Sequence, residues 1–354
     1  MTLSVMDRYK NEFVISFAKA MGENLTRWKK FQSYYRKKLY TSDLKWYALG
    51  FILGYTPGKR ETDYFSNLPA HTIMAFVIMI FAIIIAISIR NKDYQNDVKS
   101  TFFNNLFKVF NNKIKYENKY GDYTYNSILE SIENGNNDFG EEILNTQRAE
   151  TITNFTFNDS ELFQKYKVND RNDDDNFYGE YNQVKFNICE TELNNKETSK
   201  NGKSYYHQLF HGVALQFKIY KNIKSRVLIY SNGLWNKPPQ GYEKVKTEYR
   251  KFNKRFSIYA PAGTKGQIEA RYLFNTAFLD RFMQLQTSFK VNKIQCSVKD
   301  STILILLSTN KDLFEMNHLL GRIDDKHQYA KLFDEFASVL SFIDVLHLFD
   351  KTKL

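Results

Sequence analysis

One uncharged stretch constrains the fold of this chain more than any other feature of its sequence. Ala70 to Ile89, AHTIMAFVIMIFAIIIAISI, contains no Asp, Glu, Lys or Arg. About 20 apolar residues in a helix are enough to cross the hydrocarbon core of a bilayer, whereas strands usually have roughly 4 to 8 residues. The run also begins too late and is too long for a cleaved signal peptide. We therefore expect a membrane-spanning helix over 70–89, marked by Ala70, Phe76, Phe81 and Ile89.

A second, shorter apolar run precedes the first. Trp46 to Tyr55, WYALGFILGY, is too short to cross a bilayer unaided. It suits an interfacial or buried helix, and it also suits the first arm of a helical hairpin within a membrane region 46–89. The number of crossings, one or two, stays open.

Charge is distributed unevenly along the chain. The sequence carries 50 Lys and Arg against 39 Asp and Glu, a net charge of +11, which favours an anionic neighbour such as phospholipid head groups. Residues 1–69 hold 12 basic and 6 acidic side chains, whereas residues 90–354 hold 38 and 33. The positive-inside rule predicts that the C-terminal part faces the cytoplasm, and we expect the protein in the cell (inner) membrane. The flanking basic residues are Lys59 and Arg60 before the run, and Arg90, Lys92, Lys99 and Lys108 after it.

Residues 1–45 are expected to form a basic amphipathic segment on the cytoplasmic side. Aromatic and basic side chains are interleaved in ENLTRWKKFQSYYRKKLY, a pattern typical of a helix that lies on an anionic membrane surface. The candidates for contact with anionic head groups are Arg27, Lys29, Lys30, Arg36, Lys37 and Lys38.

Residues 90–116 predict a juxtamembrane amphipathic helix. Apolar residues recur at helical spacing in VKSTFFNNLFKVFNNKIK. Because so many Phe side chains would be costly to expose, we expect this stripe to pack on the following domain or to mediate self-association. Its members are Val98, Phe102, Leu106, Val109 or Phe110, and Ile114.

Residues 117–354 predict a soluble α+β domain with a mixed, mainly antiparallel sheet and packed helices. QVKFNICETEL alternates as a half-buried strand does. HGVALQFKIY and SRVLIYSN, separated by KNIK, predict an antiparallel hairpin, and KIQCSVKDSTILILLS predicts two strands around a Lys-Asp-Ser turn. Polar loops are expected at DRNDDDNFYGE and at NNKETSKNGKS.

Helical periodicity predicts two long amphipathic helices in the same domain, one over 267–286 and a closing one over about 328–349. Between the strands, EYRKFNKRFSIYA combines four aromatic with four basic residues, a composition found where proteins contact nucleic acid. Its Tyr249, Phe252 and Phe256 fall at helical spacing, and Phe256, Ile258 and Ala260 at strand spacing. We expect a helix end that runs into a strand, with its aromatics in the core.

Candidate chemistry is sparse. His207 and His211 are four residues apart, but they lead into a predicted strand, and no third ligand accompanies them. The acidic run Asp170–Glu180 lacks the Gly and the final Glu of a calcium loop. Cys189 and Cys296 are expected to be free thiols without an activating neighbour. With no phosphate-binding or hydrolase motif present, we assign no catalytic, cofactor-binding or metal-binding residue, and we expect no cofactor.

Several segments resemble a family of bacterial membrane-anchored proteins that is catalogued as domain of unknown function three-one-three-seven. The resemblance is carried, in order along the chain, by SELFQKYKVNDRNDDDNFYGEYNQVKFNICETEL, LFHGVALQFKIYK, EYRKFNKRFSIYA, EARYLFNTAFLDRFMQL and KDLFEMN, and covers about residues 100 to 320. It implies a pair of membrane helices ahead of the domain, although the first arm is short here. It implies no activity and no catalytic residue.

Three functional hypotheses follow from the sequence. The preferred one is a membrane-anchored protein whose α+β domain binds a protein partner or the anionic membrane surface without catalysis. The alternative is an enzyme or small-ligand binder tethered to the membrane. Binding of nucleic acid is a weaker third, because aromatic residues occupy core periodicity throughout.

Overall fold

The computed structural model describes residues 15, 25–45, 70–110, 114–117, 152–163, 165–233, 240–311, 313–316, 318–322 and 326–351. The chain divides into two compact units, which we call the sheet unit and the helical unit. The sheet unit comprises Met1–Ser16, Phe103–Phe314 and Tyr329–Leu354, and the helical unit comprises Phe17–Phe102 and Glu315–Gln328. The apolar arm expected at 46–55 lies outside the described residues.

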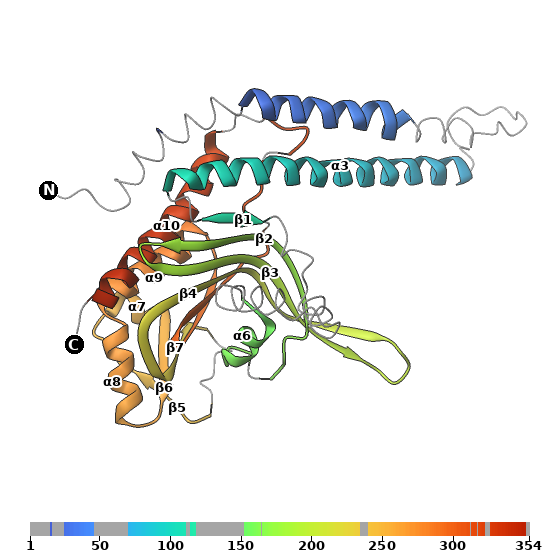
Figure 1. Cartoon of the computed structure of the whole chain (residues 1–354). Coiled ribbons are helices and arrows are strands. Elements are labelled where there is room, and N and C mark those ends of the chain that lie inside the picture. The colour runs from blue at the N-terminus through green and yellow to red at the C-terminus, as the bar shows by residue number, and fades with distance from the viewer. Residues whose placement is uncertain are drawn as a thin grey trace, which may run out of the picture. The chain divides into compact units, whose positions relative to one another are not determined.

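The sheet unit is built on one antiparallel sheet, in agreement with the predicted α+β class. The described part contains seven strands in the order β1-β2-β3-β4-β6-β5, with β7 also paired to β4 (Figure 1). All their pairings are antiparallel. The strands are β1 (Lys115–Glu117), β2 (Asp170–Tyr181), β3 (Val184–Thr198), β4 (Ser204–Ser231), β5 (Tyr242–Val245), β6 (Phe256–Pro261) and β7 (Lys293–Ser308).

Two predicted turns are wrong, because the chain continues through them as strand. β4 runs unbroken through KNIK and pairs with β7 from Gly212–Ser308 to Tyr230–Gln295. The turn-like residues mark irregularities in this ladder: the register shifts between Lys218 and Val227, and Asp300 takes a positive φ of 52°. Bulges of this kind bend strands and increase their twist. Because β4 and β7 pair along most of their length, the two sequences that favour turns form bends within the strands instead.

The acidic run is also a strand rather than a solvated turn. β2 pairs with β1 on one side and β3 on the other, with a register shift between Asp173 and Asn176. Two of its carboxylates are used inside the unit: Asp173 pairs with Arg171 at 2.5 Å, and buried Asp175 accepts a hydrogen bond from the Tyr116 hydroxyl at 2.5 Å. An arginine on the same strand and a tyrosine distant in sequence thus satisfy charges that would disfavour a strand locally.

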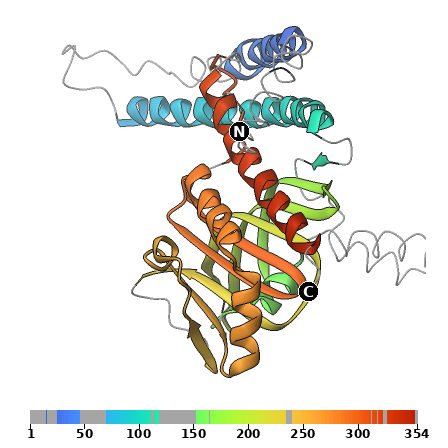
Figure 2. The same ribbon diagram turned by 90° about the vertical axis from the view of Figure 1, so that its left-hand side faces the viewer.

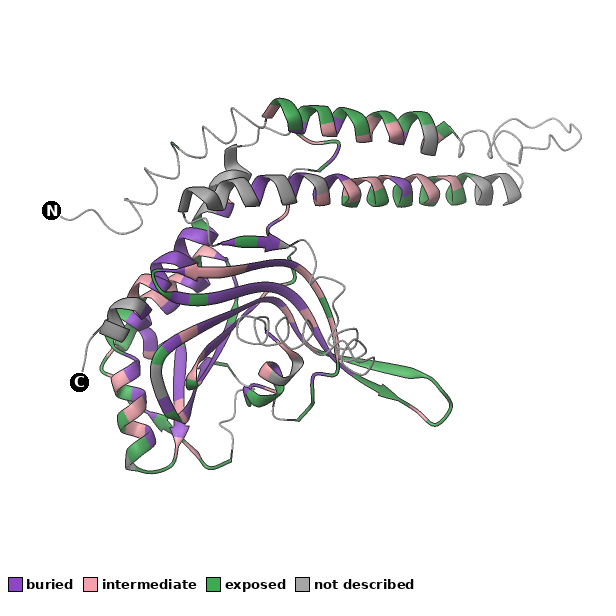
Figure 3. Ribbon diagram, viewed as in Figure 1, coloured by how far each residue is buried: buried purple, intermediate pink, exposed green. Residues whose placement is uncertain are grey.

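Both faces of the sheet are covered, so its central strands are buried on both sides. On one face, α6 (Asn154–Asp159) and its flanking residues lie in the hollow of the curved sheet (Figures 1 and 2), where Phe157 and Leu162 join a buried cluster with Ala214 and Leu306. On the other face, Phe217 packs against Phe342 of α10 (Lys326–Lys351) with ring centroids 5.2 Å apart. Figure 3 shows the resulting buried strands.

The remaining helices confirm one expectation and correct another. α7 (Arg250–Asn253) runs into β6, and Phe252, Phe256 and Ile258 are buried, as expected for the aromatic and basic junction. The single helix expected over 267–286 is instead two, α8 (Thr264–Leu273) and α9 (Thr276–Ser288). Asn275 breaks it, because its side chain caps α9 by accepting the Phe278 N–H.

The helical unit contains most of α3 (Ala70–Phe110) and a helix over 25–38 that continues into a π-helical turn, Leu39–Asp43. The helical conformation expected for 70–89 is confirmed. No helix among the described residues is long and apolar enough to cross a membrane, so they do not support the crossing expected there. The separate helix expected over 90–116 is also corrected, since α3 runs on to Phe110 and Lys115–Glu117 form β1.

Candidate functional site

The N-terminal helix is attached to α3 by one buried face. Trp28 is fully buried and meets Phe102 edge-on at 5.3 Å, and Tyr35 meets Tyr94 at 6.3 Å. Burial raises the pKa of Tyr94 to about 12, against a smaller opposing effect of Arg36, so the phenol is neutral. Phe102 of the predicted apolar stripe therefore packs on the N-terminal helix.

A segment from far along the chain, Glu315–Gly321, is held against both helices by side chains of the helical unit. We call it the strap. Gln95 binds Met316 twice: its Nε2 donates to the carbonyl at 2.8 Å, and its Oε1 accepts the N–H at 3.1 Å. Arg36 donates to the carbonyls of Leu319 and Gly321, each at 2.9 Å.

Charge fixes the first residue of the strap. Lys99, whose side chain is 2 % exposed, pairs with Glu315 at 2.5 Å. Asn91 accepts the Leu319 N–H at 2.7 Å. The strap therefore satisfies its backbone groups with specific side chains rather than with a ladder.

Between residues 76 and 89, α3 presents large apolar side chains to solvent, and we call this exposed set the apolar surface of α3. Its members are 41 % to 62 % exposed, and Phe81 is the most exposed of them. Monomeric proteins seldom expose so many neighbouring apolar groups without a partner or a lipid phase to cover them. The apolar surface of α3 comprises Phe76, Val77, Ile78, Ile80, Phe81, Ile84, Ile85 and Ile89.

The membrane and head-group residues predicted from the sequence lie on α3 and on the N-terminal helix, respectively. Phe76, Phe81 and Ile89 belong to the apolar surface of α3, while Ala70 is the first residue of that helix. Of the basic candidates, Arg36 is engaged with the strap. The others are exposed or half-buried on the N-terminal helix: Arg27, Lys29, Lys30, Lys37 and Lys38.

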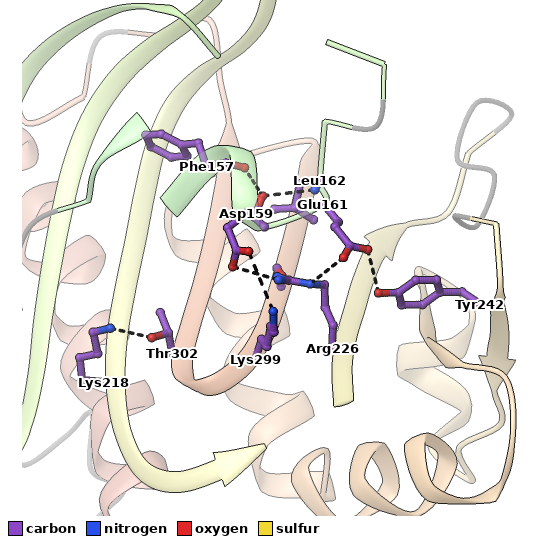
Figure 4. Close-up of polar contacts among 11 residues, drawn as sticks. Phe157, Asp159, Glu161, Leu162, Lys218, Arg226, Tyr242, Lys299 and Thr302 are labelled. Carbon is purple, nitrogen blue, oxygen red and sulfur yellow. Dashed lines mark hydrogen bonds and ion pairs between the residues drawn. The ribbon is translucent and has the colours of Figure 1, made fainter. Parts of the chain in front are cut away.

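In the sheet unit, the main polar cluster is centred on a buried arginine (Figure 4). The Arg226 side chain on β4 is 6 % exposed. It lies 2.9 Å from Asp159 and 3.1 Å from Glu161, which are close to half exposed, and it donates to Ser297 at 3.1 Å. Tyr242 of β5 donates to Glu161 at 2.8 Å. Three strands, β4, β5 and β7, meet the end of α6 and the residues after it at this point.

The arrangement around Arg226 favours attachment over acid or base chemistry. Arginine stays protonated at ordinary pH, and burial raises the pKa of Tyr242, with Glu161 adding to the effect. Nearby on the sheet, Lys218 donates to Thr302 at 2.7 Å, and burial lowers its pKa. We assign the Arg226 cluster to holding the α6 segment on the sheet.

The other candidates for chemistry are separated or inert. His207 stacks on Tyr166 at 5.3 Å, whereas His211 Nδ1 contacts the Thr309 carbonyl oxygen at 2.6 Å. Cys189 and Cys296 are free and fully buried, and burial raises the pKa of both thiols. Within the described residues, no group of three or more His, Cys, Asp or Glu side chains could hold a metal ion.

Sequence reasoning missed the Arg226 cluster and the strap. Asp159, Glu161, Arg226 and Tyr242 are scattered over more than eighty positions, and each has an ordinary local context. A basic residue at a core position of a strand was the one available signal, because a buried charge requires a partner.

One family model matches part of the chain. Residues 208–348 match the family model described as Protein of unknown function (DUF3137), which confirms the resemblance over this part of the chain. The match begins later along the chain, and also ends later, than the segments that carry the resemblance, which cover about residues 100 to 320. The search among curated proteins found no match.

Among solved structures, the chain is similar to the crystal structure of the mycobacterial trehalose monomycolate transport factor A, TtfA. The two chains are 8 % identical, and the alignment covers 52 % of this chain and 83 % of that one. The TM-score is 0.29.

Proposed function

We propose that this chain is a membrane-anchored, non-catalytic binding protein. Residues 70–89 embed in the cell (inner) membrane, and the sheet unit, facing the cytoplasm, binds a protein partner or the anionic membrane surface. The observation that carries the proposal is the apolar surface of α3, with eight large side chains 41 % to 62 % exposed. Fully burying an exposed side chain of this kind is favourable by roughly 1.5–3 kcal/mol, so completing the burial of these half-exposed ones contributes about half of that each.

The N-terminal helix supports the same orientation. It buries Trp28 against Phe102, while Arg27, Lys29, Lys30 and Lys37 stay exposed. Basic side chains next to an embedded helix gain from the negative potential of a cytoplasmic leaflet. Its exposed Tyr34 and Tyr40 are residues that suit the head-group layer.

The proposal includes no reaction step, because two buried charged groups of the sheet unit, Arg226 and Glu190, are used for attachment. Arg226 is paired with Asp159 and Glu161, and Glu190 accepts the backbone N–H of Leu313 through both carboxylate oxygens, at 2.9 and 3.2 Å. These contacts support a rigid domain whose surfaces bind a partner or the membrane.

Membrane extraction tests the anchor. We expect the protein to remain in the membrane pellet of a bacterial host after washes with high salt and with alkaline carbonate, because hydrocarbon burial is insensitive to both. Ile78→Lys combined with Phe81→Lys and Ile85→Lys should release it or abolish its accumulation. The matched control is Ile268→Lys, which alters a side chain 60 % exposed on α8 and should leave the protein in the pellet.

Release of the unaltered protein by salt alone would overturn the anchor. If the triple variant stayed in the pellet after carbonate, the apolar surface of α3 would instead be covered by protein, and crosslinking of the unaltered chain would show self-association.

Thiol labelling tests the orientation. Both native cysteines are buried, so a membrane-impermeant maleimide reports on an introduced Asn201→Cys alone. In intact cells this position should stay unlabelled, and it should label after permeabilisation. Labelling in intact cells would place the sheet unit outside the cytoplasm.

A further inference from the structure

The paired ends of β3 and β4 form a two-stranded ribbon that projects from the sheet (Figure 1). β2 accompanies β3 only as far as Asn194, whereas β3 and β4 remain paired to Thr198 and Ser204. The turn is closed by two backbone hydrogen bonds, Ser199 N–H to the Lys203 carbonyl at 2.8 Å and Gly202 N–H to the Ser199 carbonyl at 2.9 Å. An ordered ribbon of this length without a third strand is exposed on both faces (Figure 3).

Aromatic rings are fixed on the surface of this ribbon. Tyr205 and Tyr206 are each 56 % exposed. Lys196 Nζ lies 5.5 Å from the centre of the Tyr206 ring, and His207 stacks on Tyr166, itself 41 % exposed, at 5.3 Å. The rings of Tyr206, His207 and Tyr166 are therefore pre-positioned, which lowers the entropy lost on binding.

Lysines surround these rings, and we call the whole set the hairpin patch. It comprises the exposed residues Lys165, Tyr166, Lys167, Lys196, Lys200, Lys203, Tyr205, Tyr206 and His207. Residues 165–167 and 194–208 contain five Lys, one acidic residue, Glu197, and no Arg. The patch thus offers a dispersed positive charge with aromatic rings between the charges.

We propose that the hairpin patch binds the anionic head groups of a phospholipid bilayer. Tyrosine suits the interfacial layer of a membrane, because its ring enters the boundary while its hydroxyl stays hydrated. Lysine is a point charge on a flexible stem, which suits a surface of mobile phosphates. Protein interfaces, in contrast, are depleted in Lys and enriched in Arg, and the patch has the opposite composition.

This inference rests on the proposed function, since the bilayer is the one in which α3 embeds. It adds a second membrane contact from the sheet unit, made by charge rather than by hydrocarbon burial. Such a contact depends on lipid composition and on salt, whereas the α3 anchor depends on neither.

Two probes in the full chain separate the two contacts. An environment-sensitive fluorophore is attached to Asn201→Cys in the hairpin turn or, in a second preparation, to Ser88→Cys on α3; the native thiols are buried and do not compete. The protein is reconstituted into vesicles of phosphatidylcholine alone or with about one quarter phosphatidylglycerol. Quenching is measured with spin labels on the head group for position 201, and on the acyl chain for position 88.

The probe at 201 should be quenched in vesicles containing phosphatidylglycerol, and this quenching should be lost in phosphatidylcholine alone and at high salt. Each lysine near an anionic surface raises surface affinity on the order of fivefold. Lys200→Glu with Lys203→Glu should therefore lower the contact equilibrium roughly 25-fold or more. Lys251→Glu with Lys254→Glu, the same charge change at exposed sites on and beside α7, should leave it unchanged.

Quenching at 88 without any at 201 would overturn the hairpin proposal and leave the anchor standing. Absence of quenching at both positions would overturn both. Equal quenching at 201 in neutral and anionic vesicles would contradict head-group recognition, and protection of the probe by added RNA or protein rather than by lipid would assign the patch to another partner.

Discussion

Two regions of the molecule, the core of the sheet unit and the apolar surface of α3, treat large apolar side chains in opposite ways. In the sheet unit, Phe217 and Ile305 are fully buried between the sheet and its helices. In the helical unit, Phe81 and Ile84 are more than half exposed. The residue types are the same, so composition does not distinguish a core from an interaction surface. Only the presence of a covering layer does, and the uncovered case points to a partner or a lipid phase.

Polar groups show a second contrast between the units. The sheet unit satisfies its backbone mainly through strand ladders, such as the long pairing of β4 with β7. The helical unit holds the strap through individual side chains, among them Arg36 and Gln95. In a strand pairing, each hydrogen bond is one of many, so the loss of one has a small effect. The strap is held by a few side chains, so the loss of one has a larger effect.

The largest predicted effect compares one substitution in each unit. Phe217→Ala removes a fully buried ring that packs on Phe342, and should lower the free energy of unfolding by about 3–5 kcal/mol. Phe81→Ala removes a ring that is 62 % exposed, and should change it by under about 0.5 kcal/mol. Urea denaturation of both variants in the same detergent measures the difference. A comparable loss for Phe81→Ala would mean that protein, not lipid, covers α3.

The next effect is a pH dependence inside α10. Glu335 is fully buried, Lys331 Nζ lies 3.5 Å from one of its oxygens, and no described residue donates a hydrogen bond to either oxygen. Burial raises its pKa from 4.5 to about 7, opposed in part by Lys331 and Lys290, while Asp334 adds slightly to the rise. The folded state therefore holds this proton more tightly than the unfolded state does.

The sign of the effect follows from that proton. Stability is present in full below the unfolded pKa near 4.5 and is lost as pH rises through about 7. Glu335→Gln should match the unaltered protein at low pH and exceed its stability at pH 8 by about 3 kcal/mol. Denaturation at a series of pH values measures this, with exposed Glu243→Gln as control. A gain that does not vary with pH would show that the carboxyl is not buried.

A smaller effect is expected at the Arg226 cluster. Arg226→Met keeps the buried stem but removes the charge that holds Asp159 and Glu161, and should cost about 2 kcal/mol. The carboxylates are close to half exposed, so they regain water and the loss stays below that of a fully buried pair. Arg226→Lys should recover part of it. Accelerated proteolysis within 152–163 would locate the loss at the α6 segment, and unchanged stability of Arg226→Met would refute the assigned role.

The smallest effect concerns the strap. Gln95→Ala leaves the buried N–H and C=O of Met316 without their side-chain partners, at a local cost of about 1 kcal/mol, the lower end of the range for such groups. Faster hydrogen exchange should follow at Met316 and Leu319, with β4 unchanged. Gln95→Glu keeps the acceptor and loses the donor. Its rate of hydrogen exchange at Met316 should lie between those of the unaltered protein and Gln95→Ala. Equal acceleration in β4 would show that the strap and the sheet open together.

Local patterns predicted several elements correctly. The periodicity of 328–349 lies within α10, the alternation of Val184, Phe186 and Ile188 lies within β3, and the helix-to-strand junction before Phe256 is present. Each prediction needed only the repeat of one element and the face that it buries. The errors among the strands fell at KNIK, Lys-Asp-Ser, the acidic run and NNKETSKNGKS, whose first residues belong to β3, because a partner strand overrides local turn or charge signals.

The sequence by itself determined that this chain has an uncharged helix over 70–89, a basic N-terminal segment and an α+β domain, because these follow from composition and periodicity over neighbouring residues. Only the tertiary structure decided that β4 and β7 bend without breaking, that Arg226 gathers Asp159 and Glu161, and that the strap lies on the N-terminal helices. The physical reason is that strand pairing and the satisfaction of buried polar groups join residues distant in sequence, and no local pattern encodes the partner.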